Sequence, residues 1–164
     1  MTICEVATPS AAGRYCPRMP RATFSHEAAT SAPLEAVWDR LQQAETWADI
    51  GPVEDVRESQ QDETGHLQSF TWTTTVARKH YEGTAAVSDS VYRERMTLDL
   101  DAGEVAGSLE ARLAPNGNDS TIVTVTLEVV SRGTLSTLFF PVVSEAVARG
   151  LPDQVDRFAE SLND

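Results

Sequence analysis

A histidine near the start of the chain stands among apolar residues, where its side chain could move a proton. Residues 23–30 alternate so that Phe24, His26 and Ala28 share one face, which is the period of a half-buried strand. An inward imidazole titrates in the range where it can accept or donate a proton. The alternative is a histidine that is hydrogen-bonded in the core or at the edge of the sheet.

A glutamate later in the chain has a similar setting. Glu94 shares a face with Tyr92 and Met96, so burial would surround its carboxylate with apolar groups, raise its pKa and suit it to general acid or base catalysis. A shift of the strand register by one residue would instead leave Glu94 in solvent. The hydroxyls of Tyr81 and Tyr92 either contact a ligand oxygen or belong to rings that only pack.

Basic residues flank these candidates. Arg93 and Arg95 share the face opposite the glutamate, so we expect them to pair with acids in solvent. Arg78, Lys79 and His80 form a small cluster that lies either at the rim of a pocket or in an exposed turn.

The sequence predicts no metal site and no nucleophile. No pair of His or Cys stands at ligand spacing, and no Gly-rich elbow surrounds a serine. Cys4 and Cys16 both fall in residues 1–21, a segment with three Pro residues and one Gly that we expect to be a flexible leader. We expect them to be free thiols in a reducing compartment. No cofactor is expected, and whether the protein is an enzyme stays open.

The composition limits the partners. The chain has 164 residues, of which 41% are hydrophobic, and a formal net charge of −12, which repels phosphate backbones, so nucleic acid is not an expected partner. One folded domain is expected over residues 22–164. No apolar run is long enough to span a bilayer and no export signal is visible, so we expect a cytoplasmic protein without integral membrane association. The oligomeric state is not defined by the sequence.

A long amphipathic helix is predicted over Thr134–Asn163. Its apolar residues recur in steps of three and four and form one stripe. Pro141 is expected where this helix begins, and Pro152 is expected to bend it. Because such a stripe must lie on a broad apolar surface, we expect the helix to lie along a curved sheet and to enclose a cavity with it.

A series of strands offers that surface. Alternating segments separated by turn residues predict strands at about 53–59, 67–76, 80–88, 91–99, 105–113 and 121–130, after the first strand at 23–30. Two short helices follow the first strand, one opening at Pro33 and the other at 44–50. The predicted fold class is therefore α+β with an antiparallel sheet.

This order of elements resembles the helix-grip fold of the START-like (SRPBCC) superfamily, in which a curved antiparallel sheet of about seven strands wraps around a long C-terminal helix. The similarity covers about residues 22–163 and is closest to the polyketide cyclase/dehydrase-like branch. The motifs that carry it are Ser31-Ala32-Pro33 followed by Val37-Trp38 and Leu41, the aromatic Trp47, the turn Asn118-Asp119-Ser120-Thr121, and Phe140-Pro141 near the start of the last helix.

The resemblance implies a hydrophobic cavity, which different members use for lipid or hormone transfer or for polyketide cyclisation. We therefore expect binding or transport of a hydrophobic small molecule that is lipid-like, aromatic or polyketide-like. A cyclase, aromatase or dehydratase with His26, Glu94 or Tyr92 as proton-transfer candidates is one alternative, and a protein-interaction module is another. The predicted ligand-binding residues are Phe24, His26, Trp72, Tyr81, Tyr92, Glu94, Met96, Leu109, Val125, Leu138, Val142 and Ala146.

Overall fold

The computed structural model describes residues 21–163 apart from 52, 77, 118 and 133, and it does not describe the side chains at 76, 134–140, 142 and 143. Cys4, Cys16 and the rest of the expected leader up to residue 20 lie outside the described residues. The first strand covers Arg21–Thr30, where the sequence predicts a strand at 23–30.

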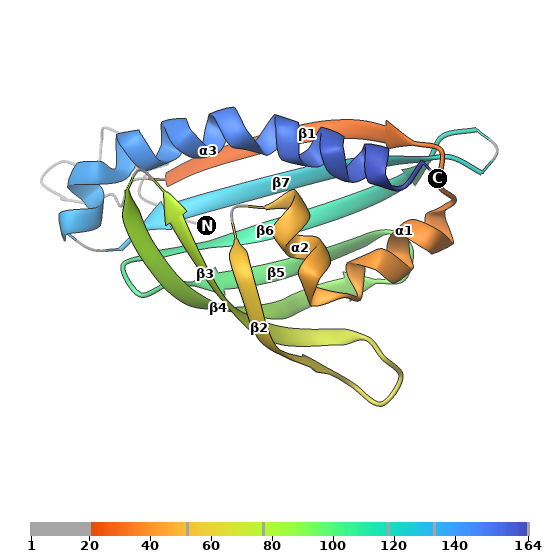
Figure 1. Ribbon diagram of the computed structural model, residues 1–164, viewed down its shortest axis with the longest axis horizontal. Helices are drawn as coiled ribbons and strands as arrows, with labels where there is room; N and C mark the ends of the chain where they lie inside the picture. Colours follow the sequence, from red (N-terminus) through yellow and green to blue (C-terminus); the bar gives the residue numbers. More distant parts are fainter. Residues whose placement is uncertain (1–20, 52, 77, 118, 133, 164) are drawn as a thin grey trace, which may run out of the picture.

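Seven strands form one curved antiparallel sheet in the order β1-β7-β6-β5-β4-β3-β2 (Figure 1). Successive strands from β2 to β7 are neighbours, and β1 completes the sheet by pairing with β7, Phe24 opposite Leu127 and His26 opposite Val125. The strands are β1 (Arg21–Thr30), β2 (Glu54–Gln61), β3 (Leu67–Val76), β4 (Lys79–Val91), β5 (Arg95–Asp101), β6 (Val105–Pro115) and β7 (Thr121–Ser131).

The described residues include three helices, α1 (Leu34–Leu41), α2 (Ala44–Ile50) and α3 (Thr134–Ser161). Figure 1 shows α3 lying along the sheet beside β1, with α1 and α2 nearer to its C-terminal end. The first turns of α3 and the β5–β6 hairpin lie at one end of the molecule, and α1 and the β2–β3 hairpin lie towards the other. The predicted α+β helix-grip architecture is confirmed.

The two short helices form where the sequence predicts them. Pro33 takes the extended N-cap conformation before α1, and Val37, Trp38 and Leu41 are buried on its inner stripe. Helix α2 buries Trp47, whose indole nitrogen donates a 3.0 Å hydrogen bond to the carbonyl of Leu41. The two helices therefore close over the sheet as one layer.

The turn between β4 and β5 corrects the predicted strand at 91–99. Strand β4 continues to Val91, β5 begins only at Arg95, and the residues between them form a tight turn in which Arg93 has a positive φ of 62°. Because this turn interrupts the alternation, Tyr92 and Glu94 are exposed, whereas Met96 is buried as predicted. The inward glutamate expected from the period of two is therefore wrong.

Helix α3 also departs from the prediction in two places. Pro141 lies in the helix interior rather than at its start, since the helix begins at Thr134. Ala146 is exposed, because the buried series runs through Val147, Leu151 and Val155 and continues to the C-terminal end of the helix. The stripe that faces the sheet is thus displaced by one residue at this point.

Most of the space between the sheet and the helices is filled. Trp47, Phe70, Met96, Leu109 and Phe158 are at most 2% exposed and belong to one apolar core. Across the described residues, none of the helices has the length and apolar character needed to cross a membrane.

Candidate functional site

An apolar cavity lies between the sheet and α3, at the end of the molecule that carries the β5–β6 hairpin. Its volume is about 60 Å³. Strands β3 to β7 supply most of its wall, and α3 supplies Val147. The described residues that line it are Val53, Trp72, Thr74, Tyr81, Leu100, Ala102, Val105, Ala106, Gly107, Leu127, Glu128, Val129 and Val147.

The cavity is smaller than the hollow expected along the whole helix. Met96, Leu109 and Val125, which we predicted to line it, are buried in the core and are absent from its described wall. One water molecule needs about 10–15 Å³, and an engineered cavity of about 150 Å³ holds benzene. The observed volume therefore suits a small apolar group rather than a whole lipid chain.

Trp72 forms one side of the cavity because its neighbour on β4 has no side chain. A Cβ atom at Gly83 would lie 2.6 Å from Cζ2 of the Trp72 ring, so only glycine allows the indole to lie against that strand. The indole nitrogen of Trp72 is buried and has no hydrogen-bond partner among the described residues. An unpaired buried donor costs about 1–3 kcal/mol.

Tyr81 is another wall residue with a polar group. It is 8% exposed, and the cationic Nζ of Lys79 lies 5.5 Å from its ring centroid. Burial, and to a smaller extent the negative charge of Glu104, raises the pKa of the Tyr81 phenol. The hydroxyl therefore stays protonated at neutral pH.

The cavity opens towards solvent at the β5–β6 turn. Ala102, Val105 and Ala106 are half-buried, in contrast to the deeper wall residues. Asp101 holds this turn by accepting hydrogen bonds from the backbone N–H of Gly103, at 2.9 Å, and from the Arg132 guanidinium, at 2.5 Å. These two contacts lower the pKa of Asp101. The rim of the opening is therefore held by a charged pair.

His26 lies outside this cavity. Phe24, on the same face of β1, packs against the core, but His26 Nε2 lies 2.9 Å from Oδ1 of Asp156 on α3. The imidazole thus connects the edge strand to the helix. This is the alternative that we considered for His26, a hydrogen-bonded histidine at the sheet edge.

The other predicted residues divide between wall and surface. Of the candidates, Trp72 and Tyr81 line the cavity, whereas Tyr92, Glu94 and Ala146 lie away from it at the surface. The side chains of Leu138 and Val142 lie outside the described residues. Arg93 pairs with Glu35, and Nε of Arg95 lies 2.6 Å from Asp89, so these arginines form the ion pairs that we expected.

Sequence reasoning missed several wall residues. Thr74 follows Trp72 on the inward face of β3, and its hydroxyl donates to a carboxylate oxygen of Glu54 at 3.3 Å. Val147 stands four residues before Leu151 on the buried side of α3. The period of two and the step of four could have identified both residues.

Comparison with known proteins identifies the fold but no close relative. No family model matches the sequence, and no curated protein is significantly similar to it. Among solved structures, a protein from Thermus thermophilus matches with a TM-score of 0.67 and 14% sequence identity, covering 86% of this chain and 97% of that one.

Two further matches carry descriptive names. A START superfamily protein from Mycobacterium smegmatis matches with a TM-score of 0.60 and 16% identity, over 86% of this chain and 99% of that one. This chain has the START-like helix-grip fold. An aromatase/cyclase, Zhui, from Streptomyces sp. R1128 matches with a TM-score of 0.57 and 19% identity, over 87% of each chain. The resemblance expected from the sequence is thus confirmed at the level of the START-like fold.

Proposed function

We propose that this protein binds the apolar end of a small molecule in the cavity between the sheet and α3. The observation that carries this proposal is an apolar cavity, open at one end, inside a START-like fold. Apolar pockets with a few placed polar groups are typical small-molecule sites. Burial of ligand surface contributes about 25 cal/mol per Å², so a small buried group gives modest affinity.

The size and shape of the cavity restrict the ligand. A volume of about 60 Å³ accommodates a short alkyl group or part of one ring, and the rest of the ligand would leave through the opening beside Ala102 and Val105. The surface that faces the cavity is wholly apolar, so the buried end of the ligand must be apolar as well. Medium-chain alcohols and substituted aromatic rings have this form.

The cyclase alternative has no specific support in the described cavity. Its proton-transfer candidates His26, Tyr92 and Glu94 do not line the wall, where Tyr81 and Glu128 are the titratable side chains among the described residues. The carboxylate of Glu128 lies 3.4 Å from the guanidinium of Arg21. We therefore propose binding rather than catalysis as the function of the cavity.

Nuclear magnetic resonance of the ¹⁵N-labelled chain tests this proposal. The probes are toluene and the straight-chain alcohols from butanol to decanol, and the reporter is the indole N–H signal of Trp72, assigned with Trp72→Phe. We expect a saturable shift of this signal that becomes larger as the alcohol lengthens and then levels off when the cavity is full. If no probe moves the Trp72 signal of the folded protein, the proposal is wrong.

A pair of helix variants provides the control. Val147 lines the cavity and is 8% exposed, whereas the adjacent Ala146 faces solvent. Val147→Phe should fill the cavity and weaken probe binding about tenfold or more, while Ala146→Phe should leave binding unchanged. Equal effects of the two substitutions would contradict this placement of the ligand.

A further inference from the structure

A second hollow lies on the outer side of the molecule, between α1, the β2–β3 hairpin and the β4–β5 turn. This groove has a volume of about 400 Å³ and shares none of its described lining residues with the cavity. The side chains that matter for its chemistry are Trp38, Asp39, Gln42, Thr64, His66 and Tyr92. Polar groups therefore dominate here, in contrast to the cavity.

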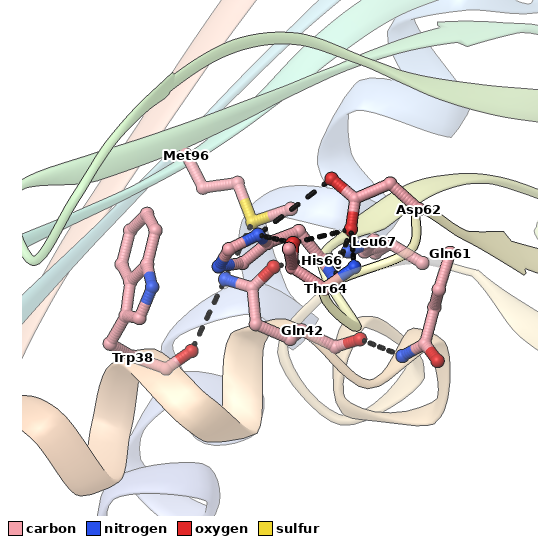
Figure 2. A network of polar contacts seen from close by, with 8 residues as sticks. All are labelled: Trp38, Gln42, Gln61, Asp62, Thr64, His66, Leu67 and Met96. Atoms are coloured by element: carbon pink, nitrogen blue, oxygen red, sulfur yellow. Dashed lines mark hydrogen bonds and ion pairs between the residues drawn. The ribbon is translucent and has the colours of Figure 1, made fainter.

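The floor of the groove is held by a buried amide. Nε2 of Gln42 donates to the carbonyl of Trp38 at 3.3 Å and to the sulfur of Met96 at 3.7 Å, and Oε1 accepts the backbone N–H of Leu67 at 3.1 Å (Figure 2). The Gln42 carbonyl in turn accepts a 2.9 Å hydrogen bond from Gln61. Because one side chain joins α1, β3 and β5, the groove keeps its shape without a ligand.

Hydrogen bonds in the β2–β3 hairpin fix the tautomer of His66. The Thr64 hydroxyl donates to Oδ1 of Asp62 at 2.7 Å and lies 2.6 Å from Nδ1 of His66. The hydrogen bond from Thr64, followed by that from the His66 backbone N–H, lowers the pKa of Asp62, so this carboxylate is ionised and only accepts. Since the hydroxyl has a single proton, Nδ1 of His66 must donate to Thr64.

The other imidazole nitrogen is therefore an acceptor when the ring is neutral. Figure 2 shows the Nε2 edge of His66 turned away from Asp62 and Thr64 and towards the indole of Trp38. Both residues line the groove. A hydrogen-bond acceptor thus stands on the side of the groove that faces the tryptophan.

Trp38 supplies a matching donor. The residue is 3% exposed, and its indole Nε1 has no hydrogen-bond partner among the described residues. The ring of Tyr92 stands perpendicular to the indole with centroids 5.8 Å apart, and Tyr92 is 61% exposed. The Arg93 guanidinium, which pairs with Glu35, lies 5.0 Å from the Tyr92 ring centroid. A ligand atom reaches this N–H only when Tyr92 leaves its contacts with Trp38 and Arg93.

The charges around the groove indicate which ligand fits. The carboxylate of Asp39 lines it, Asp62 lies behind His66, and the whole chain carries a net charge of −12. An anion would be repelled, and it would also place a second acceptor against Nε2 of His66. A neutral ligand group with one acceptor and one donor next to each other can bond both to Nε1 of Trp38 and to Nε2 of His66.

We propose that this groove binds a planar ring with a primary carboxamide, whose carbonyl oxygen accepts from Trp38 Nε1 and whose NH₂ donates to His66 Nε2. The ring then lies beside Tyr92, in the place that the moving side chain opens. This site is separate from the cavity, so its occupation does not depend on the function proposed above.

Benzamide is the probe, and benzoate, which has the same ring and no donor, is the comparator. The ¹⁵N-labelled full chain contains three tryptophans, so Trp38→Phe and Trp72→Phe assign the indole signals of the groove and of the cavity. We expect millimolar benzamide to shift the Trp38 signal saturably, while the Trp72 signal stays in place. Benzoate should cause at most a small shift of the Trp38 signal.

A pair of histidine variants tests the acceptor. His66 is exposed, and His66→Ala should weaken benzamide binding about fivefold, the effect of losing one net hydrogen bond. His80 is also exposed but does not line the groove, so His80→Ala should bind benzamide as the parent does. The proposal is overturned by a Trp38 signal that does not move, by a shift confined to Trp72, by equal binding of benzoate, or by an unchanged affinity of His66→Ala.

Discussion

The cavity and the groove both contain a tryptophan with a buried, unpaired indole N–H, but their surroundings differ. Trp72 stands among apolar side chains between the sheet and α3, whereas Trp38 stands beside an amide, a histidine and a carboxylate. The third tryptophan, Trp47, donates to a backbone carbonyl in the core. Each of these two unpaired donors belongs to a residue that lines a hollow, and the neighbouring side chains decide what that hollow can hold.

The two regions also differ in how tightly a backbone glycine is packed. Substitution of these glycines gives the largest change expected in the free energy of unfolding. A Cβ atom at Gly83 would lie 2.4 Å from the carbonyl oxygen of Asp101 and close to Trp72, so Gly83→Ala should lower the free energy of unfolding by about 3 kcal/mol. At Gly65, beside the groove, no atom lies within 4 Å of the added Cβ, and only the positive φ of 87° is unfavourable. Gly65→Ala should cost about 1 kcal/mol. Urea unfolding measures both, and equal losses would contradict the difference in packing.

The tryptophan comparison itself can be tested by removing each indole N–H. Trp47→Phe breaks a 3.0 Å hydrogen bond and leaves a buried carbonyl without its donor, whereas Trp38→Phe and Trp72→Phe remove donors that are already unpaired. We expect Trp47→Phe to be the most destabilising of the three, by about 1 kcal/mol beyond the others. If Trp38→Phe or Trp72→Phe costs as much in urea unfolding, its N–H has a partner in solution.

An alkaline titration tests the burial of Tyr81 in the cavity wall. Because the pKa of Tyr81 is raised above its ordinary value of 10.0 by burial, the protonated phenol stabilises the folded state. This contribution is complete below pH 10 and is lost as the pH rises through the folded-state pKa. The free energy of unfolding of Tyr81→Phe should therefore fall less than that of the parent between pH 9 and 11. The difference is the contribution of one titrating group, and urea unfolding at each pH measures it. Parallel curves would contradict the raised pKa.

The smallest effect is expected at the contact that belongs to neither region. The side chains of His26 and Asp156 are 29% and 55% exposed, so water competes with the hydrogen bond that joins them between β1 and α3. His26→Gln should change the free energy of unfolding by less than about 1 kcal/mol and should leave toluene and benzamide binding unchanged. A loss of either binding activity would mean that His26 acts in a site after all.

The elements of the fold could be predicted because their signals are local. The alternation in β3 and in β7, the proline at the start of α1 and the glycine that ends α2 each act over a few residues, and the structure places these elements within one or two residues of the prediction. The order of those elements was then sufficient for the START-like fold.

The site was harder to predict because it depends on small displacements. Tyr92 and Glu94 do not face inward, because three residues form a turn between β4 and β5. On α3 the buried residue is Val147 rather than the adjacent Ala146, a shift of one position from the prediction. A period of two or of 3.6 cannot show such a shift, since a single residue inverts the assignment of every side chain on a strand.

The sequence by itself determined which segments are strands or helices, since periodicity and turn chemistry act within each segment. Only the tertiary structure decided how much room remained, because volume is what is left after Trp47, Met96 and Phe158 have packed from three separate elements. The pairing of polar groups was decided in the same way. His66 and Trp38 line the same groove, and Trp72 lies on Gly83, because strands and helices distant in the chain come together there.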